Sequence, residues 1–130
     1  MNLLVDTHVW IWRLLEPEHI SPAADRLLAD PENRVHLSPI SVWETLLLAR
    51  KGRIRLLPDP QAWVQRALQT SQTIMVPLTH DIAMRSERLE GFASQDPADR
   101  FLVATALVED LTLVTADPAM IAFDEVSTAP

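Results

Sequence analysis

Short apolar segments alternate along the chain with longer segments of mixed apolar and polar residues. The apolar segments predict strands at residues 3–5, 34–37, 73–76 and 112–115, with a last short strand around Val126. The longer segments predict helices over residues 7–15, 21–29, 39–51, 60–70, 79–91 and 96–110, and a short helix after Asp117. Short apolar strands that alternate with helices are typical of a parallel sheet covered on both faces. The pattern therefore predicts an α/β fold.

Proline and glycine positions support these boundaries. Several prolines directly follow a serine or aspartate, and an N-capping side chain followed by proline marks a helix start. The five pairs predicted to start helices are Ser21-Pro22, Ser38-Pro39, Asp59-Pro60, Asp96-Pro97 and Asp117-Pro118. The only two glycines, Gly52 and Gly91, lie where two of the predicted helices should end.

Length and composition narrow the class of protein. A chain of 130 residues, 48% of them apolar, suits a single domain spanning residues 1–130. The absence of cysteine excludes disulfides, iron–sulfur clusters and cysteine zinc sites. No apolar run is long enough to span a membrane, and the N-terminus lacks the basic region of a signal peptide, so we expect a cytoplasmic protein. The net charge of −7 argues against a general nucleic-acid coat, although not against a nuclease whose carboxylates hold metal ions.

Four carboxylates stand where predicted strands give way to helices. Asp6 and Asp117 follow the first and fourth main strands, Glu44 lies less than two turns into a helix, and Asp99 lies in the first turn of another. Because ligands of parallel sheets bind beyond the carboxyl ends of the strands, we expect these acids to converge. Two carboxylates about 4 Å apart repel each other by about 4 kcal/mol at an effective dielectric constant of 20, so a counter-charge is needed. An oxygen-only ligand set favours Mg²⁺ or Mn²⁺.

Each acid also has a purely structural interpretation. Asp6 and Asp117 are competent N-caps, and Asp99, three residues after Asp96, fits a capping box. Glu44 can lie on a polar stripe of its helix, although its apolar neighbours make that less expected. The four acids together favour a metal site more strongly than any one of them.

The chain resembles the PIN-domain ribonucleases, specifically the VapC-type toxins of bacterial toxin–antitoxin pairs. The resemblance covers nearly the whole chain and rests on the order and spacing of several motifs. These are residues 3–8 (LLVDTH), 37–38 with 41–44 (LS and SVWE), 96–106 (DPADRFLVATA) and 113–117 (LVTAD). Two positions depart from the pattern: Gln95 stands where this subgroup often has His, and Ala98 where it often has Phe.

The resemblance implies a three-layer α/β/α sandwich and hydrolysis of RNA phosphodiester bonds by water that Mg²⁺ or Mn²⁺ activates. Carried over position by position, Asp6 and Asp99 are the principal metal ligands, and Glu44 and Asp117 complete the catalytic site. It also implies a homodimer and inhibition by a small cognate antitoxin protein. Asp96 matches a further acid of the subgroup, which we interpret mainly as a helix cap.

Two other features are candidates for the site. The single basic cluster, Arg50, Lys51, Arg53 and Arg55, can hold RNA phosphates or can simply decorate a helix C-terminus. His8 lies two residues from Asp6, where a structural role is favoured over a catalytic one. The four tryptophans are expected in the core or in a dimer interface, with base stacking open to at most one of them.

The main alternative to an enzyme is a non-catalytic module of the same fold that binds RNA or a partner protein. A phosphatase with an aspartate nucleophile requires a second aspartate two residues after Asp6, and this chain has His8 there. A receiver domain requires an aspartate at the end of a middle strand, where this chain has Val76-Pro77. The four acids favour the nuclease.

Overall fold

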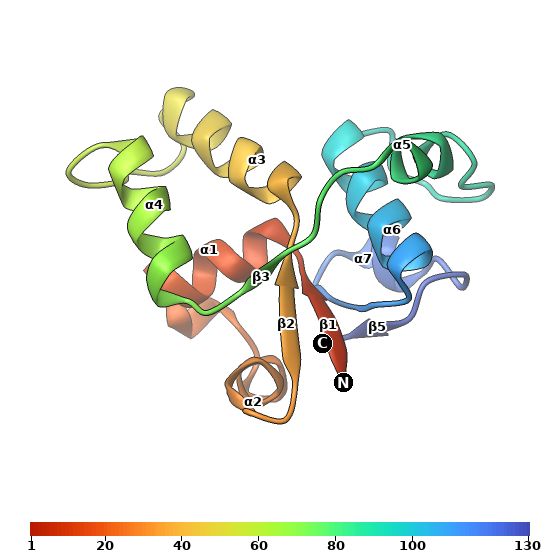
Figure 1. The fold of residues 1–130 in the computed structure, drawn as a ribbon, viewed down its shortest axis with the longest axis horizontal. Coiled ribbons are helices and arrows are strands. Elements are labelled where there is room, and N and C mark those ends of the chain that lie inside the picture. Colours follow the sequence, from red (N-terminus) through yellow and green to blue (C-terminus); the bar gives the residue numbers. More distant parts are fainter.

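The computed structural model describes residues 1–130 and contains one five-stranded sheet (Figure 1). The strands lie in the order β3-β2-β1-β4-β5, and every neighbouring pair is parallel. Their bounds are β1 (Asn2–Val5), β2 (Arg34–Leu37), β3 (Ile74–Met75), β4 (Thr112–Val114) and β5 (Thr128–Ala129). The first strand of the chain is therefore the central one, and the carboxyl ends of all strands point to the same edge.

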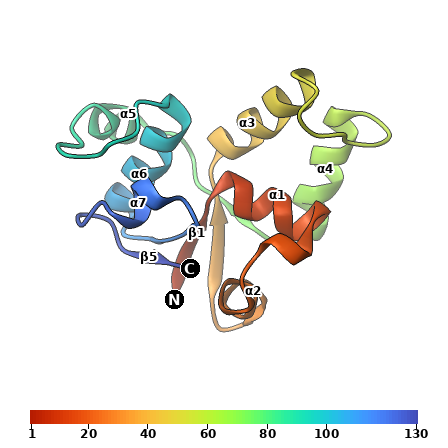
Figure 2. The ribbon, with the colours of Figure 1, turned by 180° about the vertical axis from the view of Figure 1, so that it is seen from behind.

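Helices cover both faces of this sheet, so the three-layer α/β/α expectation is confirmed. In Figures 1 and 2, α1 to α4 lie on one side of the central strands and α5 to α7 on the other. Their bounds are α1 (Thr7–Leu15), η1 (Pro17–His19), α2 (Pro22–Ala29), α3 (Pro39–Arg50), α4 (Pro60–Thr70), α5 (His80–Ser86), α6 (Pro97–Glu109) and α7 (Pro118–Ile121).

The residues of the central strand β1 are all apolar from Leu3 to Val5, with no alternation of apolar and polar positions, because both faces of the strand are covered. Leu3 and Val5 pack into a core with α1 and α2, whereas Leu4 packs into a second core with α6 and α7. Successive side chains of a strand point to opposite faces, so a strand covered on both faces has no polar position. All three side chains are buried.

The predicted helix starts are confirmed at the level of hydrogen bonds. At the five pairs predicted to start helices, the capping side chain accepts from a backbone N–H of the first turn: Ser21, Ser38, Asp59, Asp96 and Asp117. Gly52 follows the C-cap of α3 with a positive φ of 74°, which a residue with a Cβ adopts only at a cost.

Two predicted boundaries are wrong. The helix expected to reach Gly91 ends at Ser86, because the chain then turns so that Leu89 and Phe92 become buried. The last strand lies at Thr128–Ala129 and not around Val126, whose side chain is buried in the core instead. Both errors come from apolar residues that enter the core from irregular segments. None of the helices is long and apolar enough to span a membrane.

Candidate metal centre

Asp6 lies at the carboxyl end of β1 and is only 5% exposed. It occupies the N-cap position of α1, but its side chain makes no capping hydrogen bond, so the capping interpretation is wrong for this residue. Its Oδ2 instead accepts a hydrogen bond of 2.8 Å from the Thr115 hydroxyl. The same hydroxyl accepts from the backbone N–H of Asp117 at 3.0 Å. One threonine thus connects the ends of β1 and β4.

Burial raises the pKa of Asp6 to about 6. The hydrogen bond from Thr115 and the nearby His8 oppose this rise, whereas the carboxylates of Asp99 and Glu44 add to it. Asp6 is therefore a buried carboxyl group within electrostatic range of two other acids, which lie 38 and 93 positions away in the sequence. A cation beside Asp6 would favour its ionised form.

Asp99 lies in the first turn of α6, and its Oδ2 accepts a hydrogen bond of 2.8 Å from the Ser94 hydroxyl. A capping box would require Asp99 to accept from the backbone N–H of Asp96, but that N–H donates to Ser94 Oγ at 3.2 Å. The capping-box interpretation is therefore wrong, and Asp96 alone caps α6 by accepting from Ala98 N–H at 2.9 Å. Burial raises the pKa of Asp99, and the carboxylates of Asp96, Asp117 and Glu44 raise it further.

Arg100 fixes the segment that carries Ser94. Its Nε donates to the Ser86 carbonyl at the end of α5 at 3.0 Å, and its second guanidinium nitrogen donates to the Ser94 carbonyl at 3.1 Å. The side chain is 15% exposed, so these bonds are partly shielded from water. The guanidinium thus serves backbone carbonyl groups and the exposed Glu87, 3.9 Å away, and forms no ion pair with the four acids.

Asp117 and Glu44 complete the group. Asp117 Oδ1 accepts from Ala119 N–H at 2.9 Å, so the capping interpretation holds for this residue, and its second oxygen is not needed for the cap. Glu44 is half-buried on α3, and its charge raises the pKa of both Asp6 and Asp99. Glu44 and Asp99 therefore act on Asp6, and Glu44 and Asp117 act on Asp99, although the four acids come from different parts of the sequence.

The side chains of these acids do not converge on one point. No group of three His, Asp or Glu side chains is arranged so that it could hold a metal ion in this conformation. Thr115 and Ser94 each hold one oxygen of an acid at 2.8 Å, while like charges push the four groups apart. The donor set still fits a hard divalent cation, because it consists of carboxylate oxygens with unsatisfied negative charge. Joint ligation would require the acid side chains to move closer together.

The remaining candidates are more peripheral. Arg50, Lys51, Arg53 and Arg55 are all exposed, at the C-terminal end of α3 and in the loop towards α4, away from the α3 end that follows β2 (Figure 1). None of them takes part in an ion pair. His8 is exposed, and its ring centroid lies 5.9 Å from that of Trp12.

Two residues at this edge, Thr115 and Ser94, were missed by the reasoning from sequence. Each is a small hydroxyl side chain within five residues of an acid, and such residues are too common in loops and strand ends to stand out. In the case of Thr115, its place at the end of an apolar strand, two residues before Asp117, is the one available signal.

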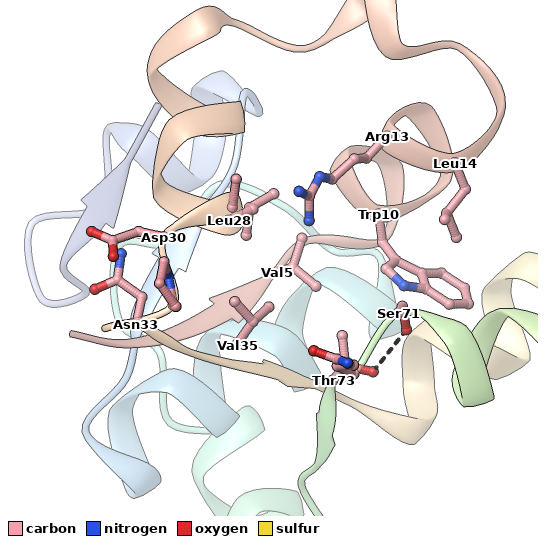
Figure 3. Close-up of a pocket in the computed structure, with 13 residues that line it drawn as sticks. Val5, Trp10, Arg13, Leu14, Leu28, Asp30, Asn33, Val35, Ser71 and Thr73 are labelled. Carbon is pink, nitrogen blue, oxygen red and sulfur yellow. Dashed lines mark hydrogen bonds between the residues drawn. The ribbon is translucent and has the colours of Figure 1, made fainter.

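A cavity of about 290 Å³ lies elsewhere, between α1, α2 and the start of β3 (Figure 3). None of the four acids lines it. Trp10 and Leu14 stand at one end and Asp30 and Asn33 at the other, and the buried indole N–H of Trp10 has no hydrogen-bond partner. Asp30 already accepts from the Glu32 N–H at 2.9 Å. This cavity is therefore separate from the acidic group.

Comparison with known families agrees with the fold and the motifs. The PIN domain profile matches residues 3–126, which is nearly the whole chain. The chain belongs to the PIN domain family. A relative, Ribonuclease VapC22 of Mycobacterium tuberculosis, is 32% identical over 116 residues, which cover 89% of this chain and 87% of the relative. The predicted resemblance to VapC-type PIN domains is thus confirmed.

Solved structures of PIN domain complexes share the fold. The VapBC2 complex of Rickettsia felis, crystallised with a DNA fragment from its promoter, contains a chain with a TM-score of 0.75 and 15% identity, over 99% of this chain and 98% of that one. VapBC from Salmonella typhimurium, also bound to DNA, gives a TM-score of 0.73 with 14% identity, over 99% and 97%. FitAcB from Neisseria gonorrhoeae gives 0.63 with 24% identity, over 100% and 97%.

Proposed function

We propose that this PIN domain is an Mg²⁺- or Mn²⁺-dependent endoribonuclease and the toxin of a toxin–antitoxin pair that acts on RNA in the cytoplasm. The observation that carries the proposal is the buried Asp6 carboxyl group at the carboxyl edge of the sheet, within electrostatic range of Glu44 and Asp99, with Asp117 in range of Asp99. None of the four acids takes part in an ion pair, which suits a protein that recruits divalent cations. The relative named as a ribonuclease supports RNA as the substrate.

In this proposal Asp6 and Asp99 are the principal metal ligands. Each has one oxygen held by a hydroxyl group, from Thr115 and Ser94 respectively, which leaves the other oxygen for a cation. Glu44 and the second oxygen of Asp117 complete the ligand set, directly or through water. The bound ions would activate the attacking water and stabilise the leaving oxygen of the phosphodiester.

The basic residues and the partners follow from the same function. Arg50, Lys51, Arg53 and Arg55 are free to contact RNA phosphates, which would help a protein with a net charge of −7 to hold its substrate. The similarity to chains of VapBC complexes supports a small antitoxin as partner. An arginine of that partner could pair with the acids in place of the metal. We also propose that the protein forms a homodimer.

The first test is cleavage of cellular RNA by the purified protein with Mg²⁺ or Mn²⁺ and with excess EDTA. We expect cleavage with either ion and none with EDTA, with recovery when Mn²⁺ is returned. Glu44→Gln, which keeps the size of the side chain and removes its charge, should weaken cleavage and Mn²⁺ affinity together. RNA binding without cleavage under all of these conditions would favour the non-catalytic alternative.

A further inference from the structure

The structure separates the four tryptophans, which the sequence treats alike. Trp10 is buried and meets Trp63 edge-on, with ring centroids 6.0 Å apart, so both serve the packing of α1 against α4. Trp43 is 51% exposed on α3. Trp12 is different, because it is half-buried and lines a pocket.

This pocket has a volume of about 290 Å³ and lies between α1, the η1–α2 segment and α7. Its apolar wall includes Val9, Trp12, Ile20 and the half-exposed Ile121. No aspartate or glutamate lines it, although the chain carries 18 acidic residues. The acids whose side chains contact the lining residues are Asp6, which accepts from Thr115, and Glu16, which lies beside His19.

The pocket and the acidic centre share one wall residue, Thr115, whose side chain is fully buried. This residue lines the pocket, and its hydroxyl also donates to Asp6 Oδ2 at 2.8 Å and accepts from the Asp117 N–H at 3.0 Å. A group in the pocket is therefore separated from two of the four acids by a single side chain. A phosphate at the acids and a base in the pocket can belong to adjacent parts of one nucleotide strand.

The pocket has two aromatic side chains, Trp12 and His19, and Trp12 also contacts His8, which lies outside the pocket lining. The His8 and Trp12 ring centroids are 5.9 Å apart with planes at 51°, and Trp12 and His19 are 5.8 Å apart with planes at 89°. The Glu16 carboxylate lies 2.7 Å from His19 Nδ1 and restricts that ring. Indole and imidazole rings offer the flat surfaces on which nucleobases stack.

We propose that this pocket binds one nucleobase of the RNA substrate, next to the phosphate at the acidic centre, with Trp12 as the stacking surface. The inference rests on the proposed function and adds a base-binding subsite to it. A nucleobase fits better than a peptide helix, because the pocket of about 290 Å³ is at the lower end of small-molecule sites and below the roughly 400 Å³ that one helix turn with its side chains fills. An apolar, acid-free wall accepts any base without sequence readout.

The test uses nucleoside 5′-monophosphates as probes and ribose 5-phosphate as the matched probe without a base. With ¹⁵N-labelled protein and Mg²⁺, we expect the nucleotides to shift the indole N–H signal of Trp12, and ribose 5-phosphate to leave it unchanged. Trp12→Phe assigns the signal and should keep most of the affinity. Trp12→Leu keeps the bulk of the side chain without an aromatic face and should weaken nucleotide binding roughly 5- to 100-fold. Trp43→Leu is the control for an exposed indole outside the pocket.

Three outcomes would overturn the inference. One is an unshifted Trp12 signal with nucleotides while the protein still cleaves RNA, which would leave the proposed function intact. Another is an equal shift with ribose 5-phosphate, because the base would then contribute nothing. The third is a Trp12 signal that responds to the antitoxin alone, which would make the pocket a protein-binding site. Nucleotide binding at Trp12 without RNA cleavage would support the pocket and contradict the enzyme.

Discussion

The ends of β1 and β4 have the same local sequence pattern and different chemistry. In both places a short apolar strand is followed by an aspartate at the N-cap position of a helix. Asp117 uses Oδ1 to cap α7, whereas Asp6 makes no capping bond and turns its carboxylate to Thr115. Asp6 is buried, and Asp117 is half-buried.

This difference shows that an acid at a strand end stabilises the fold as a cap only when its side chain accepts a hydrogen bond from the following backbone N–H groups. At the N-terminus of α7, Asp117 accepts the hydrogen bond from the N–H of Ala119. Its negative charge also raises the pKa of Asp99 in α6. Asp6 is buried without a capping role, so a single hydrogen bond offsets the free-energy cost of removing its carboxylate from water. A buried carboxylate of that kind indicates function more strongly than a capping one.

The largest expected effect that separates the two acids is on catalysis. Asp6→Asn should lower RNA cleavage with Mg²⁺ on the order of a thousandfold, since metal charge stabilisation is worth several kcal/mol. Asp117→Asn should lower it only about tenfold, because one oxygen of Asp117 already serves the helix. The measurement is the initial rate of RNA cleavage at saturating Mg²⁺, with circular dichroism as the check on folding. Equal losses would mean that capping leaves Asp117 fully available as a ligand.

The next effect is on stability without metal. Asp6 has an unfolded pKa of 3.8 and a folded pKa of about 6, so the folded state binds the proton more tightly. Stability therefore falls as the pH rises between about 4 and 6, and the penalty at pH 7.5 is about 3 kcal/mol. Asp6→Asn removes this penalty, so the metal-free variant should be more stable than the wild type at pH 7.5 and equally stable at pH 4.

Urea denaturation in EDTA at the two pH values measures this difference in the free energy of unfolding. Asp124→Asn, at an exposed acid, is the matched control and should show no such pH dependence. Adding Mg²⁺ at pH 7.5 should stabilise the wild type and not Asp6→Asn, because only ligands that bind the folded state stabilise it. A variant less stable than the wild type at pH 7.5 would show that the hydrogen bond to Thr115 outweighs desolvation.

Much of this comparison could be predicted from sequence. The apolar runs and the capping pairs placed the strands and helices, and the rule for parallel sheets brought Asp6, Glu44, Asp99 and Asp117 to one edge. Which acid caps and which is buried could not be predicted, because both follow a strand and precede a helix. That distinction depends on Thr115, whose partner Asp6 lies 109 residues away. The roles of Ser94 and Arg100 were hidden because they act in an irregular segment.

The smallest expected effect is on stability, and it distinguishes the capping role of Asp117 from the role of its charge. Asparagine is about as good an N-cap as aspartate, whereas alanine costs about 1 kcal/mol of stability. Asp117→Ala should therefore lower the free energy of unfolding by about 1 kcal/mol relative to Asp117→Asn, when both are measured in EDTA. Both variants lack the carboxylate, so their rates of RNA cleavage should agree once the folded fraction is taken into account. A lower rate in Asp117→Ala alone would mean that the cap of α7 positions Thr115 and, through it, Asp6.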